Sequence, residues 1–183
     1  MVRAHLGLAP WDVLHSGLTK HLPIDIGQAL VIVSFVVMLG WIPLREIPGL
    51  GTISNALVIG FSTDAFLAVL PRLESLPVRA LVVVTAIALQ GLATAAYIGA
   101  QLGRGPRDGL MTGLARRTGR SLRLVRTLME LTVVAIGLLL GGVAGLATVL
   151  YAVSIGPVSQ ALLPRLLVDV SPRDVSDGAV RGT

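Results

Sequence analysis

The chain has 183 residues, of which 54% are hydrophobic and only 14% are charged. Soluble domains carry about 25% charged residues, so this composition indicates a protein that lives in lipid. The formal net charge is +5, but no aromatic or glycine-rich recognition motif accompanies the basic residues, so nucleic acid is not an expected partner. The absence of cysteine excludes disulfides, thiolate metal sites and a cysteine nucleophile.

The first expected element is a short amphipathic helix over residues 10–22, and a similar one is expected over residues 106–118. Each opens with a proline at a favourable first helical position and has an aspartate two residues later, close to the positive helix end. At about 15–20 Å, such a helix can enter half a bilayer or lie on its surface. Arg116, Arg117 and Arg120 favour the surface for the second helix, because they would hold its end in water.

Longer apolar runs predict an all-α, polytopic transmembrane bundle that forms a single membrane domain over residues 1–183. A crossing needs about 20 mainly apolar residues. The uncharged run over residues 131–164 is too long for one crossing, so we expect two crossings that turn at residues 141–145. This arrangement places Glu130 inside the membrane. The expected spans, about five in number, are residues 26–44, 49–70, 79–103, 122–142 and 146–164.

The chain repeats itself with an offset of 96 residues. From position 7 to position 64, 14 of 58 residues are identical to their counterparts, mainly at small and turn-forming positions. The repeats are residues 7–70 and 79–164, and each is expected to be a three-span unit. The first lacks a counterpart of the span over residues 79–103. We expect that the sequence starts too late and that the missing span lies upstream of Met1, rather than that the protein has lost this helix.

Arginines predict how the chain is oriented. Seven of them lie between positions 104 and 126, and such a connection stays in the cytoplasm during insertion. Counting crossings then places residues 165–183 in the cytoplasm as a disordered tail. The first proline-aspartate motif falls outside and its copy inside, so the repeat is inverted, as in many transporters. The expected location is the inner membrane of a bacterium.

Two sequence motifs carry a family resemblance. They are Leu8-Ala9-Pro10-Trp11-Asp12-Val13-Leu14, followed by Gly17-Leu18, and Gly103-Arg104-Gly105-Pro106-Arg107-Asp108-Gly109-Leu110-Met111, followed by Glu130 and Gly156-Pro157. Together they resemble the bacterial integral membrane proteins of the YczE/YitT-like group, over nearly all of residues 7–164. The resemblance implies a multi-span membrane protein without a defined activity. Pro10, Trp11, Gly105, Pro106 and Arg107 are the candidate structural motif.

Four acidic residues are candidates for an ion or proton pathway: Asp12, Asp64, Asp108 and Glu130. An ionisable group at membrane depth is costly unless it is paired or faces water. Asp12 and Asp108 are explained equally by helix capping. An ion pair with Arg126, one helical turn earlier, is the alternative for Glu130. Asp64 has no cation on its own helix, and Arg72 or Arg79 would be its partner.

Gly60, Gly156 and Pro157 are candidate flexible points, because Pro157 removes a helix hydrogen bond and frees carbonyl groups. Close packing of helices is the alternative explanation for the glycines. His5, His15 and His21 are poor candidates for metal binding, since they have no counterparts in the second repeat and no nearby carboxylate cluster beyond Asp12 and Asp25.

These patterns predict a small transporter or permease for a small solute or ion, without a cofactor or bound metal. Sequence signatures of hydrolases, zinc proteases and phosphate-binding loops are absent, so an enzyme is not expected. The alternative is a non-transporting membrane partner that stabilises or regulates another protein. Expected partners are the lipid bilayer and a second copy of the chain.

Overall fold

A computed structural model describes residues 1–71, 73–99 and 105–166, and all regular elements in these ranges are helical. The expected all-α fold is therefore confirmed, while the tail from residue 167 onward lies outside the described residues. The elements are η1 (Val2–Ala4), α1 (Pro10–Leu18), α2 (Ile26–Leu39), α3 (Trp41–Leu44), α4 (Leu50–Val69), α5 (Leu76–Gly99), α6 (Pro106–Thr118), α7 (Leu122–Leu139) and α8 (Leu146–Leu166).

Three segments of the described chain are long and apolar enough to cross a membrane: Ile26–Leu44, Leu50–Val69 and Leu76–Ala96. Leu146–Ser159 is a shorter apolar helix. Large apolar side chains stay exposed along these helices, among them Val58, Phe61 and Phe66 on α4. Lipid is the solvent that suits such surfaces.

Local capping chemistry explains why the helices begin where they do. Pro10 and Pro106 occupy the first turns of α1 and α6, and the residues before them have nearly the same backbone angles, φ −61° and ψ 152° at Ala9 and φ −60° and ψ 156° at Gly105. At the start of α4 the Gly49 amide donates to Thr52 Oγ1 over 3.3 Å. The same bond, from the Gly145 amide to Thr148 Oγ1 over 3.1 Å, begins α8.

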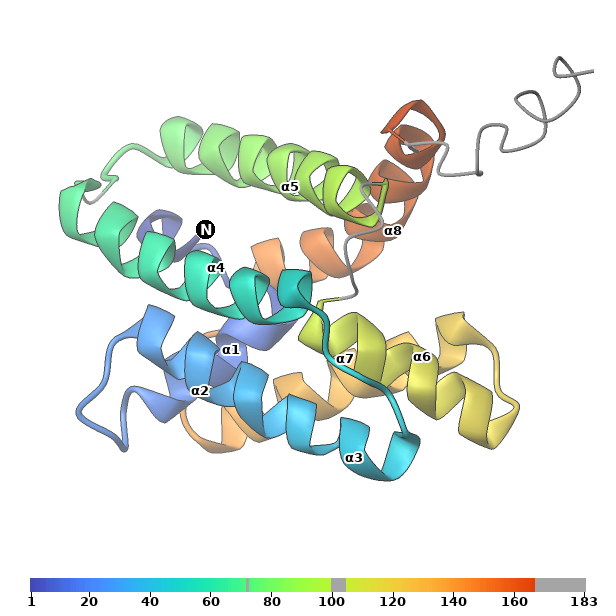
Figure 1. Cartoon of the computed structure of the whole chain (residues 1–183). Coiled ribbons are helices and arrows are strands. Elements are labelled where there is room, and N and C mark those ends of the chain that lie inside the picture. The colour runs from blue at the N-terminus through green and yellow to red at the C-terminus, as the bar shows by residue number, and fades with distance from the viewer. Residues whose placement is uncertain (72, 100–104, 167–183) are drawn as a thin grey trace, which may run out of the picture.

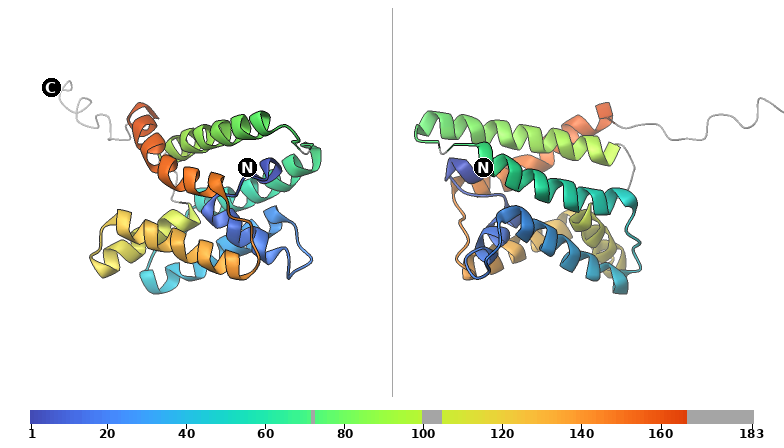
Figure 2. Two further views of the ribbon diagram at one scale, coloured as in Figure 1. Left: turned by 180° about the vertical axis from the view of Figure 1, so that it is seen from behind. Right: turned by 60° about the vertical axis from the view of Figure 1, so that its left-hand side comes forward.

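The two short helices begin near each other inside the bundle and run apart in opposite directions (Figures 1 and 2). The guanidinium carbon of Arg107, on α6, lies 4.8 Å from the ring centroid of Trp11, on α1. Their first turns therefore meet, and their far ends, near Thr19 and Gly119, point to opposite ends of the bundle.

Each short helix packs closely on the long helix that follows the other short helix. A Cβ placed on Gly17 of α1 would lie 2.8 Å from the Gly137 carbonyl oxygen and from Leu140 Cβ on the α7 side. A Cβ placed on Gly113 of α6 would lie 2.9 Å from Leu44 Cδ1 on α3. The approach at Gly17 is to a backbone carbonyl and leaves no room for a side chain, whereas the approach at Gly113 is to the movable end of the Leu44 side chain.

The remaining helices complete the bundle in pairs. In Figures 1 and 2, α5 lies beside α8 on one side of the molecule, and α4 lies beside α2. Trp11, Val33 and Val133 form a buried cluster that joins α1, α2 and α7. This cluster holds the first turn of α1 in the interior.

Three expected boundaries were wrong by three residues or more, and one of them is the end of the fourth span, because α7 ends at Leu139 and not at position 142. The helix expected over residues 10–22 ends at Leu18, and the chain then closes short turns in which the Lys20 amide donates to Gly17 and the His21 amide to Leu18. Pro23 explains the early end, because a residue before proline disfavours the helical conformation. The third expected span begins at Leu76, three residues before the expected position 79.

Candidate functional site

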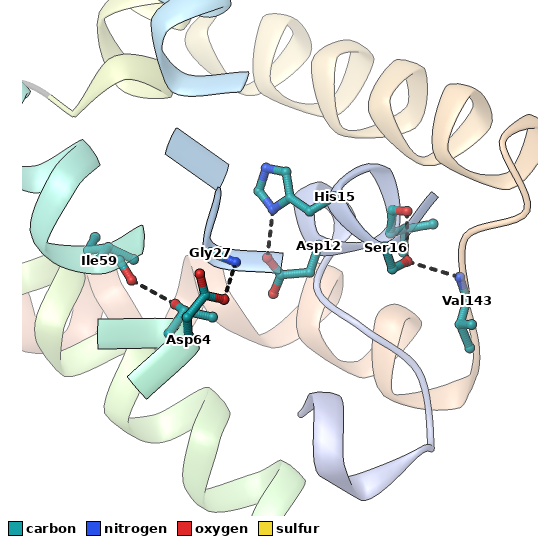
Figure 3. Close-up of polar contacts among 9 residues, drawn as sticks. Asp12, His15, Ser16, Gly27, Ile59, Asp64 and Val143 are labelled. Carbon is teal, nitrogen blue, oxygen red and sulfur yellow. Dashed lines mark hydrogen bonds and ion pairs between the residues drawn. The ribbon is translucent and has the colours of Figure 1, made fainter. Parts of the chain in front are cut away.

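Helix α1 carries an aspartate–histidine pair in which His15 is buried and Asp12 is partly exposed. His15 Nδ1 lies 3.2 Å from Asp12 Oδ1, three residues earlier on the same helix (Figure 3). The His15 residue is 0% exposed. Ser16 fixes the neighbouring connection, since its hydroxyl donates to the Val13 carbonyl over 2.9 Å and accepts from the Val143 amide over 3.3 Å (Figure 3).

The first turn of α6 places a cation beside this pair. Arg107 lies over the face of Trp11, a geometry in which the guanidinium is attracted by the ring. Asp12 and Arg107 also attract each other electrostatically. Arg107 therefore contacts the indole of the other helix start and stabilises the charge of the Asp12 carboxylate.

Helix α7 carries a second ion pair. Arg126 Nε donates to Glu130 Oε1 over 3.0 Å, one turn apart on the helix. Glu130 and the Tyr151 phenol of α8 both act electrostatically on Arg107, and Arg126 acts on Asp108. We call these groups the central cluster: Asp12, His15, Arg107, Asp108, Arg126, Glu130 and Tyr151.

The central cluster unites three of the four acidic residues that the sequence singles out. The expected pair between Arg126 and Glu130 is confirmed. Asp12 and Asp108 lie in the first turns of their helices, as capping requires, and Asp12 also pairs with His15.

Burial and neighbouring charges act differently on the two aspartates, which lie outside the three candidate spans. Burial raises the pKa of Asp12, but the hydrogen bond and charge of His15 and the charge of Arg107 outweigh it, so the pKa falls below its usual value. Burial raises the pKa of Asp108 to about 6, although Arg126 opposes the shift. At neutral pH Asp12 is thus firmly ionised, while Asp108 is close to its titration range.

Asp64 lies apart from the central cluster. Its Oδ1 accepts a hydrogen bond from the Gly27 amide over 2.7 Å, so this α4 side chain caps the first turn of α2 (Figure 3). The expected pairing with Arg79 is wrong, because Arg79 instead donates to the carbonyl groups of Ala4 and His5. Arg72, the other expected partner, lies outside the described residues.

The three candidate flexible points have different surroundings. A Cβ on Gly60 would collide with Val31 and with the Gly27 carbonyl, so close packing accounts for this glycine. A Cβ on Gly156 would meet no heavy atom of the described chain within 4 Å, so packing does not account for Gly156. Helix α8 continues through Pro157 without ending.

The proline and glycine motif at the start of α6 is held by an aromatic residue of α3. Trp41 Nε1 donates to the Pro106 carbonyl over 2.9 Å in a buried bond. The Trp41 ring also fills the space in which a Cβ on Gly109 would lie. Gly105 and Pro10 act through backbone position, as the residue before one short helix and the first residue of the other.

Sequence reasoning missed His15, Tyr151 and Trp41. The spacing of three residues between Asp12 and His15 was a usable signal, since such side chains are neighbours on a helix. Tyr151 and Trp41 gave no local signal, because their partners lie far away in the chain.

The central cluster offers acids, bases and cations but not a typical metal site. Within residues 1–71, 73–99 and 105–166, no three histidine, cysteine or acidic side chains lie close enough to hold a metal ion. What the cluster can do is pair an ionic group or carry a proton, because it contains an acid that titrates near pH 6 and a buried imidazole.

Comparison with known proteins places this architecture in a family. The family of unknown function DUF6198 matches residues 1–164. The chain belongs to this family. An uncharacterized protein of Haemophilus influenzae is 42% identical over 163 residues, which cover 89% of this chain and 75% of that protein.

The uncharacterized membrane protein YczE of Bacillus subtilis is 33% identical over 162 residues, covering 87% of this chain and 75% of that protein. The uncharacterized protein YyaS of the same organism is 25% identical over 167 residues, covering 89% of this chain and 83% of its own length. No solved structure matches the chain. The expected YczE-like resemblance is confirmed, and with its apolar helices this member of DUF6198 is an integral membrane protein.

Proposed function

We propose that this protein is a transporter or permease for a small solute or ion, with its pathway through the central cluster. The supporting observation is that charged side chains of α1, α6 and α7 act electrostatically on one another within a bundle of apolar helices, with the Glu130 side chain only 19% exposed beside Arg126. Charged groups are costly in such surroundings and usually mark a pathway for ions, protons or polar solutes.

The pathway is proposed to lie between two halves in opposite orientations. Helices α1, α2 and α4 begin 96 residues before α6, α7 and α8, respectively. The exchange of packing partners between Gly17 and Gly113 supports the same arrangement. Such halves can rock about a central site and open it to each side in turn.

The proposed location and orientation of the protein in the membrane follow from the same inverted arrangement. We place the protein in the bacterial inner membrane, with the arginine-rich connection after α6 and the carboxyl terminus in the cytoplasm. Chemistry on a substrate is not part of this proposal, and the protein works without a cofactor. A second copy packed through the apolar faces of α4 and α5 completes the proposed assembly.

Purified protein in proteoliposomes tests the transport proposal. A panel of small organic anions, cations and neutral metabolites is screened by thermal stabilisation, and solutes that stabilise the protein are then tested for uptake. We expect at least one solute to be taken up, and Glu130→Gln and Asp108→Asn to reduce its uptake. Lack of stabilisation and of flux across the panel would overturn the proposal.

One further observation favours the alternative function, a non-transporting membrane partner. An apolar cavity of about 430 Å³ opens between the amino terminus and α4, lined by side chains such as Val58, Ser62 and Phe66. A helix of another membrane protein could pack there. This function predicts co-purification with one companion and full tolerance of neutral substitutions in the central cluster.

A further inference from the structure

His15 has one ring nitrogen that the described chain leaves unsatisfied. Nδ1 pairs with Asp12 Oδ1 at 3.2 Å, whereas the buried Nε2 has no hydrogen-bond partner among the described residues. Buried polar atoms without a partner are uncommon in native proteins, and each needs an explanation. This atom belongs to a side chain that is 0% exposed.

The pairing with Asp12 determines which nitrogen carries the proton. An ionised carboxylate can only accept, so Nδ1 must donate to it. A neutral His15 then has a free lone pair on Nε2. Burial lowers the pKa of His15, Arg107 lowers it further, and Asp12 opposes both, so the ring is neutral at pH 7.

The charged groups around His15 come from several elements. Asp12 lies on its own helix, and Lys20 is exposed beyond the end of that helix. Helix α6 contributes Arg107 and Asp108, and burial raises the pKa of Asp108 to about 6.

Helix α7, which packs on α1, carries Arg123, Arg126 and Glu130, of which the last two pair with each other. Helix α2 has no charged residue between Ile26 and Leu39, and the Met1 amine acts on Asp12. Among the described residues of the central cluster, His15 is the one imidazole, and Asp108 is the acid that titrates between pH 5 and 7.

We propose that Nε2 of His15 is a proton-binding site, and that the proton is the ion coupled to transport. A proton from water forms a bond with the Nε2 lone pair, and the resulting imidazolium pairs with the Asp12 carboxylate. Release of the proton to water on the other side restores the neutral ring. Asp12 is a positioning residue here, because it fixes the tautomer that leaves Nε2 free. This inference rests on the proposed function for its transport step but not for the binding step.

Nitrogen NMR of the full chain in lipid nanodiscs, with labelled histidine, tests the binding step. His15→Gln assigns the signal, while His5→Gln and His21→Gln are matched controls because both residues are exposed. We expect a neutral ring with its proton on Nδ1 at pH 7, which becomes imidazolium at a pH below the ordinary histidine value. Asp12→Asn should remove the preference for Nδ1. A proton on Nε2 at pH 7, or no protonation down to pH 4, would overturn the proposal.

A flux measurement tests the coupling step separately. In proteoliposomes with an imposed pH gradient, His15→Gln should reduce gradient-driven uptake by about tenfold or more and leave uptake down a solute gradient measurable. His21→Gln should match the parent protein. If His15→Gln retains full gradient-driven uptake, the coupling role is overturned. If the NMR titration is as expected but no solute moves in any preparation, the transport proposal fails and the proton site stands.

Discussion

The first turns of α1 and α6 begin from nearly the same backbone, but the pKa values of their aspartates shift in opposite directions. Ala9 and Gly105 differ by 4° or less in each angle, and a proline and an aspartate follow at the same spacing. Asp12 has His15 three residues later, whereas the residue three after Asp108 is Met111. Local sequence therefore fixes the shape of these turns, while side chains one turn away decide which of the two acids stays ionised.

The largest expected effect concerns the glycines at which the two short helices pack closely on their neighbours. Gly17→Ala should lower the free energy of unfolding by about 1–3 kcal/mol, because the new Cβ meets a backbone carbonyl 2.8 Å away. Gly113→Ala should lower the free energy of unfolding by less than about 1 kcal/mol, because the Leu44 methyl group can move away from the new Cβ. Thermal unfolding in detergent measures both, with Gly156→Ala as the unhindered control. Equal losses for Gly17 and Gly113 would contradict the packing described.

Neutralising the two aspartates should have opposite effects at pH 7. Asp12→Asn should destabilise the fold by about 2 kcal/mol, since it removes the charge that pairs with His15 and Arg107. Asp108→Asn should stabilise it by about 1 kcal/mol, since an ionised Asp108 is penalised by burial. Chemical unfolding in mixed micelles compares the two variants, and changes of the same sign would refute the difference between the sites.

The pH dependence of stability sharpens the same comparison. With a pKa of about 6, native Asp108 holds a proton that the unfolded chain has already lost, so its contribution to stability improves as pH falls from 7 to 5. Asp12 works in the other direction: its stabilisation is present above the ordinary aspartate pKa and is lost as pH falls through the lowered value. Melting temperatures measured at a series of pH values test this contribution. The gain in melting temperature that Asp108 provides between pH 7 and pH 5 should be absent in Asp108→Asn. If the melting temperature of this variant depends on pH as that of the parent protein does, the raised pKa of Asp108 is contradicted.

The smallest expected effect is the coupling between the two helix starts. A double-mutant cycle with Trp11→Leu and Arg107→Gln should give a coupling energy of about 0.5–2 kcal/mol, because the guanidinium lies 4.8 Å from the ring centroid. Both single variants and the double variant are measured by the same unfolding assay. Additive effects would show that the two turns do not interact.

Much of the fold could be predicted because its signals are local. Pro10, Pro106 and the boundary at Leu122 mark helix starts through capping and hydropathy, which neighbouring residues determine. The end of α1 was placed too late, since apolar Leu22 continues the pattern although Pro23 disfavours helix there.

The candidate site was only partly predictable, for physical reasons. Glu130 and Arg126 pair within one helix, so their spacing was enough. Asp64 pairs with a backbone amide on another helix, and such a donor leaves no mark in the sequence. His15 matters because it is fully buried in the folded chain, which the sequence of α1 alone does not reveal.

Cysteine labelling from the two sides of the membrane tests the central claim most directly. The chain has no native cysteine, so Lys20→Cys after α1 and Arg120→Cys after α6 can each be labelled alone, and both positions are exposed. If the short helices run apart from a shared centre, a membrane-impermeant reagent should label one variant from the outside of sealed cells and the other only after the membrane is opened. Labelling of both variants from the same side would contradict the account.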